Sequence, residues 1–125
     1  MKAMLNMLGL CARAGKLITG EKACILAIRA GSACVALLDG AASANAVKAM
    51  GDACESYGVP LVRTGGYQLG DAIGKPGRMA AAVTDAGMAA RIIELSAADS
   101  IGDALRPNDL TGQRSDRVYG GALRE

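Results

Sequence analysis

Apolar and polar residues follow two periodicities between residue 3 and about residue 97. In residues 3–13, Met4, Leu8 and Cys11 recur at i, i+4 and i+7, which places them on one face of a helix. The polar face of this helix is expected to contain Lys2, Asn6, Gly9 and Arg13. Similar spacings predict further helices over about residues 20–30, 43–57, 65–73 and 86–97.

Short apolar runs between these helices predict strands at Leu17-Ile18, Ala33–Leu38, Leu61–Arg63 and Met79–Val83. The run Ala33–Leu38 contains no polar residue and ends at Asp39-Gly40. We therefore expect it to be a central strand covered on both faces. Because helices alternate with strands, the sequence predicts an α/β fold, a three-layer α/β/α sandwich around a small mixed central sheet.

The alternation fades after Ser96. We predict one domain over residues 1–97 and a flexible C-terminal tail over residues 98–125, with helical content near Ile101–Leu105. The apolar runs are too short to span a bilayer. The apolar start of the chain continues into Arg13 without the cleavage site of a signal peptide. We expect a monomer in the cytoplasm, with no membrane partner.

The hydrophobic residues make up 51% of the sequence, but Trp and Phe are missing, so the core must be built from aliphatic side chains, Met and Cys. The four cysteines form no C-x-x-C pair. A zinc site would have to draw its ligands from four separate elements. We expect buried free thiols, a reducing compartment, and neither a metal nor a cofactor.

Histidine, the usual acid–base group near neutral pH, is missing from the sequence. The aspartates at turns and polar helix faces are expected to be solvated or to cap helices: Asp39, Asp52, Asp71 and Asp85. Tyr57 continues the apolar spacing of its helix, so we expect it in the core. We predict no enzymatic activity. Any RNA binding is expected to use backbone amides, basic groups and RNA shape rather than aromatic stacking.

Positive charge is concentrated near the start of the chain, where residues 1–31 contain five Lys or Arg and one Glu. The stretch Ala14–Lys22 has two glycines, two lysines and a threonine between two predicted helices. We expect it to bring backbone N–H groups, a helix N-terminus and two ammonium groups into one small patch suited to phosphate oxygens. An ordinary surface turn is the alternative. A phosphate-binding loop is not expected, because Gly9 and Gly15-Lys16 have the wrong spacing and lie in a helix.

Several segments carry a family resemblance in collinear order over about residues 3–95. They are Leu8–Glu21, Ala27–Gly31, Val35–Leu38, Tyr57–Leu61, Leu69–Lys75 and Ala82–Asp85. In these segments the chain resembles the kink-turn-binding ribosomal proteins of the L-seven-Ae type, and within them the bacterial YlxQ branch. The resemblance implies a ribosomal-protein-like domain that binds a sharply bent RNA duplex.

In that family, the N-terminus of the second helix enters the major groove at sheared G·A pairs, and the loop before the last strand covers a flipped-out nucleotide. By this resemblance, Gly15 and Lys16 are expected near phosphates, and Gly20, Glu21 and Lys22 opposite the G·A pairs. Arg29 continues the basic face of the same helix. Gly77, Arg78, Met79 and Ala80 correspond to the loop over the flipped-out nucleotide.

The expected function is therefore that of a ribosome-associated protein for kink-turn-like structured RNA, in ribosomal RNA or an mRNA leader. The alternative is a protein-interaction module on the same fold with a decayed RNA surface. Its basis is Leu26, an apolar residue on the basic stripe of Lys22 and Arg29. Ala23 and Leu26 stand where many RNA-binding members carry Glu or Gln and Lys. An enzyme is the third reading, since a related fold occurs as the substrate-binding domain of RNA methyltransferases. We expect the chain to have no room for their catalytic domain.

Overall fold

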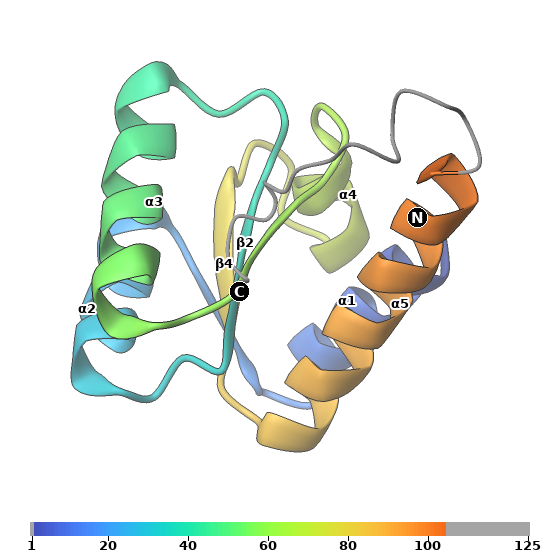
Figure 1. Cartoon of the computed structure of the whole chain (residues 1–125), viewed down its shortest axis with the longest axis horizontal. Coiled ribbons are helices and arrows are strands. Elements are labelled where there is room, and N and C mark those ends of the chain that lie inside the picture. The colour runs from blue at the N-terminus through green and yellow to red at the C-terminus, as the bar shows by residue number, and fades with distance from the viewer. Residues whose placement is uncertain (1, 105–125) are drawn as a thin grey trace.

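The computed structural model describes the chain over residues 2–104, with side chains described as far as residue 98. A sheet forms the middle layer, α2 and α3 cover one face, and α1, α4 and α5 cover the other (Figure 1). This arrangement confirms the predicted three-layer sandwich. The helices are α1 (Lys2–Arg13), α2 (Glu21–Ala30), α3 (Ala44–Tyr57), α4 (Gln68–Ile73) and α5 (Ala86–Ala104). The strands are β1 (Leu17–Thr19), β2 (Val35–Leu38), β3 (Leu61–Arg63) and β4 (Ala80–Val83).

The sheet is mixed, as predicted, with the strand order β1-β4-β2-β3. Strand β4 runs antiparallel to both β1 and β2, whereas β2 and β3 are parallel. Every residue of β2 and β4 is buried, which agrees with strands covered on both faces. The antiparallel register pairs Leu38, the last residue of β2, with Ala80, the first residue of β4. This pairing fixes which loops meet at one edge of the sheet.

Each face of the sheet carries its own apolar core. Met4, Leu8 and Cys11 of α1 pack with Leu69 and Ile92 on one face. On the other face the buried side chains come from α2, α3 and the sheet, and include Cys24, Ile28, Met50, Cys54 and Ala82. All four cysteines are free thiols, three of them buried, while Cys34 is partly buried. Burial raises the pKa of Cys24 to about 12, so this thiol stays protonated.

Local signals fix several helix ends as the sequence predicts. The hydroxyl of Ser43 accepts a hydrogen bond from the Ala46 N–H at 3.1 Å, and Gly58, with φ 69°, ends α3. At the start of α5, Asp85 Oδ2 accepts from the Met88 N–H at 2.8 Å. Helix α5 continues beyond the predicted end near residue 97 to Ala104. Residues 105–125, which include most of the predicted tail, lie outside the described part of the chain.

The prediction that Tyr57 lies in the core is wrong, since this residue is 51% exposed. Helices α2 and α3 pack together, but α2 has 10 residues and α3 has 14. Both helices start at the same edge of the sheet, so the last turn of α3 extends past the end of α2. The apolar spacing therefore continues beyond the surface that could bury it. Among the helices described over residues 2–104, none is long and apolar enough to cross a membrane.

Candidate nucleic-acid interface

Three loops and a helix N-terminus meet at the edge where β2 and β3 end and β4 begins. Leu38 of β2 pairs with both Ala80 of β4 and Arg63 of β3. The chain segments that follow β2 and β3 therefore lie beside the segment that precedes β4. Helix α2 also starts here, because the Gly20 N–H donates to the Ala80 carbonyl at 3.0 Å. We call this surface the loop edge; it comprises residues 20–22, 39–43, 64–67 and 74–79.

Gly20 brings the start of α2 against the loop before β4. Its φ of 97° and ψ of 138° belong to a region that favours glycine. A Cβ atom at this position would lie 3.2 Å from Arg78 Nη1. Gly20 thus permits both the backbone turn and the approach of the Arg78 guanidinium. Two predicted site residues, 58 positions apart in sequence, lie close together here.

The electrostatics of this contact favour an anion. The first N–H groups of α2, at residues 21–23, have no carbonyl partner within the helix, and Gly20 provides no side-chain cap. The exposed side chains of Lys22 and Arg78 add two positive charges. Within residues 2–98, no carboxylate lies within 4 Å of either cation. Glu21, in the first turn of α2, offsets part of this positive potential.

The loop of residues 74–79 is held in place by close backbone packing. A Cβ atom on Gly70 would lie 2.7 Å from the Lys75 carbonyl oxygen and 2.9 Å from the Gly77 nitrogen, so only glycine allows this contact. The Lys75 N–H donates to the Gly70 carbonyl at 2.9 Å, and the Asp39 N–H donates to the Met79 carbonyl at 2.7 Å. These contacts present Gly77 and Arg78 to solvent and leave Met79 partly buried.

Ala80 does not belong to the exposed loop. It is the first residue of β4, and its side chain is buried in the core beneath α2 and α3. The resemblance places Ala80 at a nucleotide, but here only its backbone lies near the loop edge. The physical reason is its pairing with Leu38, which turns its side chain into the core.

The expectation that Asp39 is solvated is also wrong, because its side chain is fully buried. Its Oδ1 accepts hydrogen bonds from Thr64 Oγ1 and the Leu69 N–H, both at 3.0 Å. Its Oδ2 accepts from the N–H groups of Ala41, at 2.8 Å, and Tyr67, at 2.6 Å. Burial alone raises the pKa of Asp39, but these four hydrogen bonds outweigh burial and lower the pKa below its usual value. Asp39 therefore fastens the loop after β2 to the loop after β3.

The predicted patch over Ala14–Lys22 is divided in two. Strand β1 separates Lys16 from Gly20 by about 13 Å, the length of four extended residues. At the opposite edge of the sheet from Gly20, the Lys16 carbonyl accepts from the Thr84 N–H at 3.0 Å. Gly15 lies there too, just before Lys16. Residues 17–19 form an extended strand paired with β4, as predicted for Leu17-Ile18, and this strand holds the two ends of the stretch apart.

The loop edge therefore unites part of the predicted site. It brings together Gly20, Glu21, Lys22, Gly77, Arg78 and Met79. Arg29 is exposed on α2, about 10 Å further along the helix axis than Lys22. Two exposed residues that were not predicted lie at the same edge, namely Arg63 and Tyr67. Arg63 is placed there by the pairing of β3 with β2, and Tyr67 by its hydrogen bond to Asp39, 28 residues away, so no local pattern could reveal the position of Tyr67.

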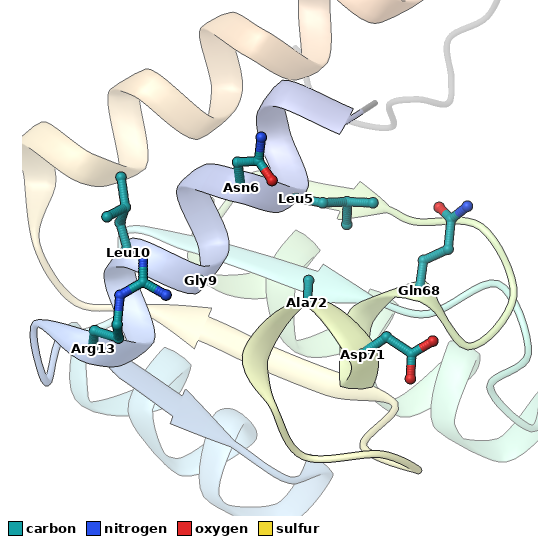
Figure 2. A pocket seen from close by; sticks show the side chains of 8 residues that line it. All are labelled: Leu5, Asn6, Gly9, Leu10, Arg13, Gln68, Asp71 and Ala72. Atoms are coloured by element: carbon teal, nitrogen blue, oxygen red, sulfur yellow. The ribbon is translucent and has the colours of Figure 1, made fainter.

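A hollow of about 560 Å³ lies between α1 and α4, away from the loop edge (Figure 2). Arg13 lies at one end and Gln68 at the other, as Figure 2 shows. The sequence predicts Gly9 on a polar face, but it is buried where α1 crosses α4. The backbone of α4 packs closely on it, since a Cβ atom at Gly9 would lie 3.1 Å from the Ala72 carbonyl oxygen. Among the lining residues within the described part of the chain, Asp71 supplies a carboxylate without a second one beside it for acid–base chemistry.

Comparison with known proteins identifies the family. The family model of the ribosomal protein L7Ae/L30e/S12e/Gadd45 family matches residues 2–93. The chain belongs to this family. It is 41% identical over 90 residues to the RNA-binding protein YlxQ of Bacillus subtilis (strain 168), a match over 71% of this chain and 90% of the relative. It is 39% identical over 95 residues to the RNA-binding protein YlxQ of Enterococcus faecium, over 75% of this chain and 90% of the relative. The predicted YlxQ-like member of the L7Ae family is thus confirmed.

Two solved structures share the fold. A protein of unknown function from Bacillus halodurans has a TM-score of 0.72 and 36% identity, covering 75% of this chain and 96% of that structure. The 15.5kD RNA-binding protein of Giardia lamblia has a TM-score of 0.65 and 24% identity, covering 75% and 84% of the two chains. The second likeness concerns the fold.

Proposed function

We propose that this L7Ae-family protein binds structured RNA of the kink-turn type through the loop edge, without enzymatic activity. The contact between Gly20 and Arg78 carries the proposal, because it joins the open N-terminus of α2 to a cation of the loop before β4. Helix N-termini and basic side chains are suited to phosphate oxygens. Relatives about 40% identical in sequence are RNA-binding proteins by name. The proposal includes action as a cytoplasmic monomer on the ribosome, on ribosomal RNA or on an mRNA leader.

The decisive measurement compares two RNAs in a gel-shift assay at fixed salt. One is a kink-turn oligonucleotide, and the other is the same RNA with its G·A pairs replaced by Watson–Crick pairs. We expect the protein to prefer the kink-turn. Equal affinity for both would mean general electrostatic attraction and would overturn the kink-turn proposal.

Two charge reversals then locate the interface. Lys22→Glu reverses a charge at the loop edge, and we expect it to abolish kink-turn binding without unfolding the protein, because the Lys22 side chain is exposed. Arg91→Glu makes the same change in net charge on the exposed surface of α5 and serves as the matched control. Equal losses in both variants would show that net charge, not the loop edge, governs binding.

A protein-interaction module remains the second candidate because of one observation on α2. Leu26 is 60% exposed, one turn beyond Lys22 on the same face. An apolar side chain between two basic residues is suited to a protein partner. Ribosomal proteins that stay bound to the wild type after RNase treatment, but not to Leu26→Ser, would favour this candidate.

A further inference from the structure

Tyr67 combines an exposed ring with a constrained backbone. Its side chain is 65% exposed, in a chain whose 125 residues contain three tyrosines and no Trp or Phe. Its φ of 64° makes it the one non-glycine residue with positive φ in the described part of the chain. A side chain in this conformation costs free energy that glycine does not pay. Two glycines, Gly65 and Gly66, directly precede Tyr67, yet the position with positive φ is occupied by the tyrosine.

Asp39 holds the backbone of Tyr67 in this conformation. The buried carboxylate accepts from the Tyr67 N–H at 2.6 Å and from the Leu69 N–H at 3.0 Å. The N–H of Asp39 also donates to the Met79 carbonyl, next to Arg78. A single residue thus connects the backbone of Tyr67 to the loop that carries Arg78. Because Tyr67 is largely exposed, the constraint on its backbone fixes where an aromatic group is presented to solvent.

We infer that Tyr67 is an RNA-binding residue of the loop edge, whose ring stacks on an unstacked base, and that Asp39 is its positioning residue. This inference rests on the proposed function. Unstacked bases in folded RNA are commonly bound by aromatic side chains. Arg63, whose Nη2 lies 3.4 Å from the Asp39 carbonyl oxygen, and Arg78 provide cations on neighbouring segments for the adjoining phosphates. This inference departs from the expectation that any RNA binding avoids aromatic stacking.

The test uses three variants of Tyr67 with the full chain and the kink-turn oligonucleotide. Tyr67→Ala should weaken binding by about 5- to 150-fold, the usual effect of losing one base–aromatic stack. Tyr67→Phe keeps the ring and should bind like the wild type. Tyr67→Gly removes the ring and relieves the backbone, so binding should fall as in Tyr67→Ala while the melting temperature does not fall. Weaker binding without lower stability separates an RNA contact from a structural role.

Tyr57→Ala is the matched control, because Tyr57 is an exposed tyrosine at the end of α3, about 20 Å from the loop edge. It should leave affinity unchanged. A 2-aminopurine placed at each unpaired position of the RNA gives a direct readout: at the stacked position the wild type and Tyr67→Phe should alter its fluorescence, and Tyr67→Ala should not.

The outcomes separate the two claims. If the wild type prefers the kink-turn and Tyr67→Ala binds it equally well, the role of Tyr67 is overturned and the proposed function stands. If the wild type does not bind the kink-turn, both claims fail.

Discussion

Replacing Asp39 by Asn tests whether its carboxylate fastens the loops together. The carboxylate accepts hydrogen bonds from four donors, two at each oxygen. An amide nitrogen in place of Oδ2 would face the N–H groups of Ala41 and Tyr67. An amide nitrogen in place of Oδ1 would face the Leu69 N–H and the Thr64 hydroxyl. This hydroxyl can accept a hydrogen bond from the amide and donate its own proton to the Gly65 carbonyl, 3.1 Å away. We therefore expect the second orientation, with the Leu69 N–H left without its acceptor.

The expected loss of stability follows from these contacts. An unsatisfied buried N–H costs about 1–3 kcal/mol, and the surviving bonds to Asn lose the extra strength of a charged acceptor. Removing a buried charge offsets part of this loss, so we expect a net destabilisation of about 2–3 kcal/mol. Urea unfolding at neutral pH measures it. In native-state hydrogen exchange, Leu69 should lose protection while Ala41 and Tyr67 keep theirs.

The pH dependence gives an independent check on the same residue. Because the folded-state pKa of Asp39 is lowered, its stabilisation is fully present above the unfolded pKa of about 3.9 and is lost as the pH falls through the folded value. The stability difference between the wild type and Asp39→Asn should therefore be constant from pH 7 to 5 and shrink below pH 4. An unchanged difference at pH 3, or equal stability at pH 7, would refute this account.

Three further variants test the loop edge. Gly20→Ala should destabilise the fold by about 1–2 kcal/mol in urea unfolding, because φ is 97° at this position. It should also weaken RNA binding, because the added methyl group displaces the Arg78 side chain. Unchanged RNA binding would count against a role for the approach of Arg78 to Gly20. Lys16→Glu should weaken kink-turn binding less than Lys22→Glu in the same gel shift, since the two lysines lie at opposite ends of β1; a larger effect at Lys16 would restore the single patch. Leu26→Lys should change the free energy of unfolding by no more than about 0.5 kcal/mol, because the side chain is exposed. It should steepen the slope of log affinity against log salt concentration by the equivalent of about one phosphate contact. An unchanged slope would place the second turn of α2 away from the RNA.

Much of the fold is encoded in local patterns. Residues 61–63 form β3 at the predicted bounds, and α3 starts after Ser43 and ends at Gly58 as predicted. These features depend on a cap, a glycine or an apolar run within a few residues. The helix predicted from Gly65 begins only at Gln68, because residues 64–67 wrap around Asp39. Asp39, whose carboxylate holds this segment, lies 25 to 30 residues before the residues that it binds.

The candidate site was predictable only where the family pattern supplied tertiary information. That pattern paired the start of α2 with the loop before β4, and the structure brings Gly20 and Arg78 together. The burial of Ala80 and the distance between Lys16 and Gly20 both follow from strand pairing with β4. Tyr67 could not be found from the sequence, since its position depends on a hydrogen bond to Asp39.

The sheet topology explains why one buried carboxylate has so much influence on this surface. Antiparallel β4 lies between β1 and β2, so its first residue adjoins both the start of α2 and the end of β2. Asp39 follows β2 directly and can reach the loops on either side of it. These loops are therefore already ordered in the folded protein before any ligand binds. A preordered surface loses less conformational entropy on binding. Variants of Asp39 should consequently lose RNA affinity and folding stability together, whereas Tyr67→Gly should lose affinity alone.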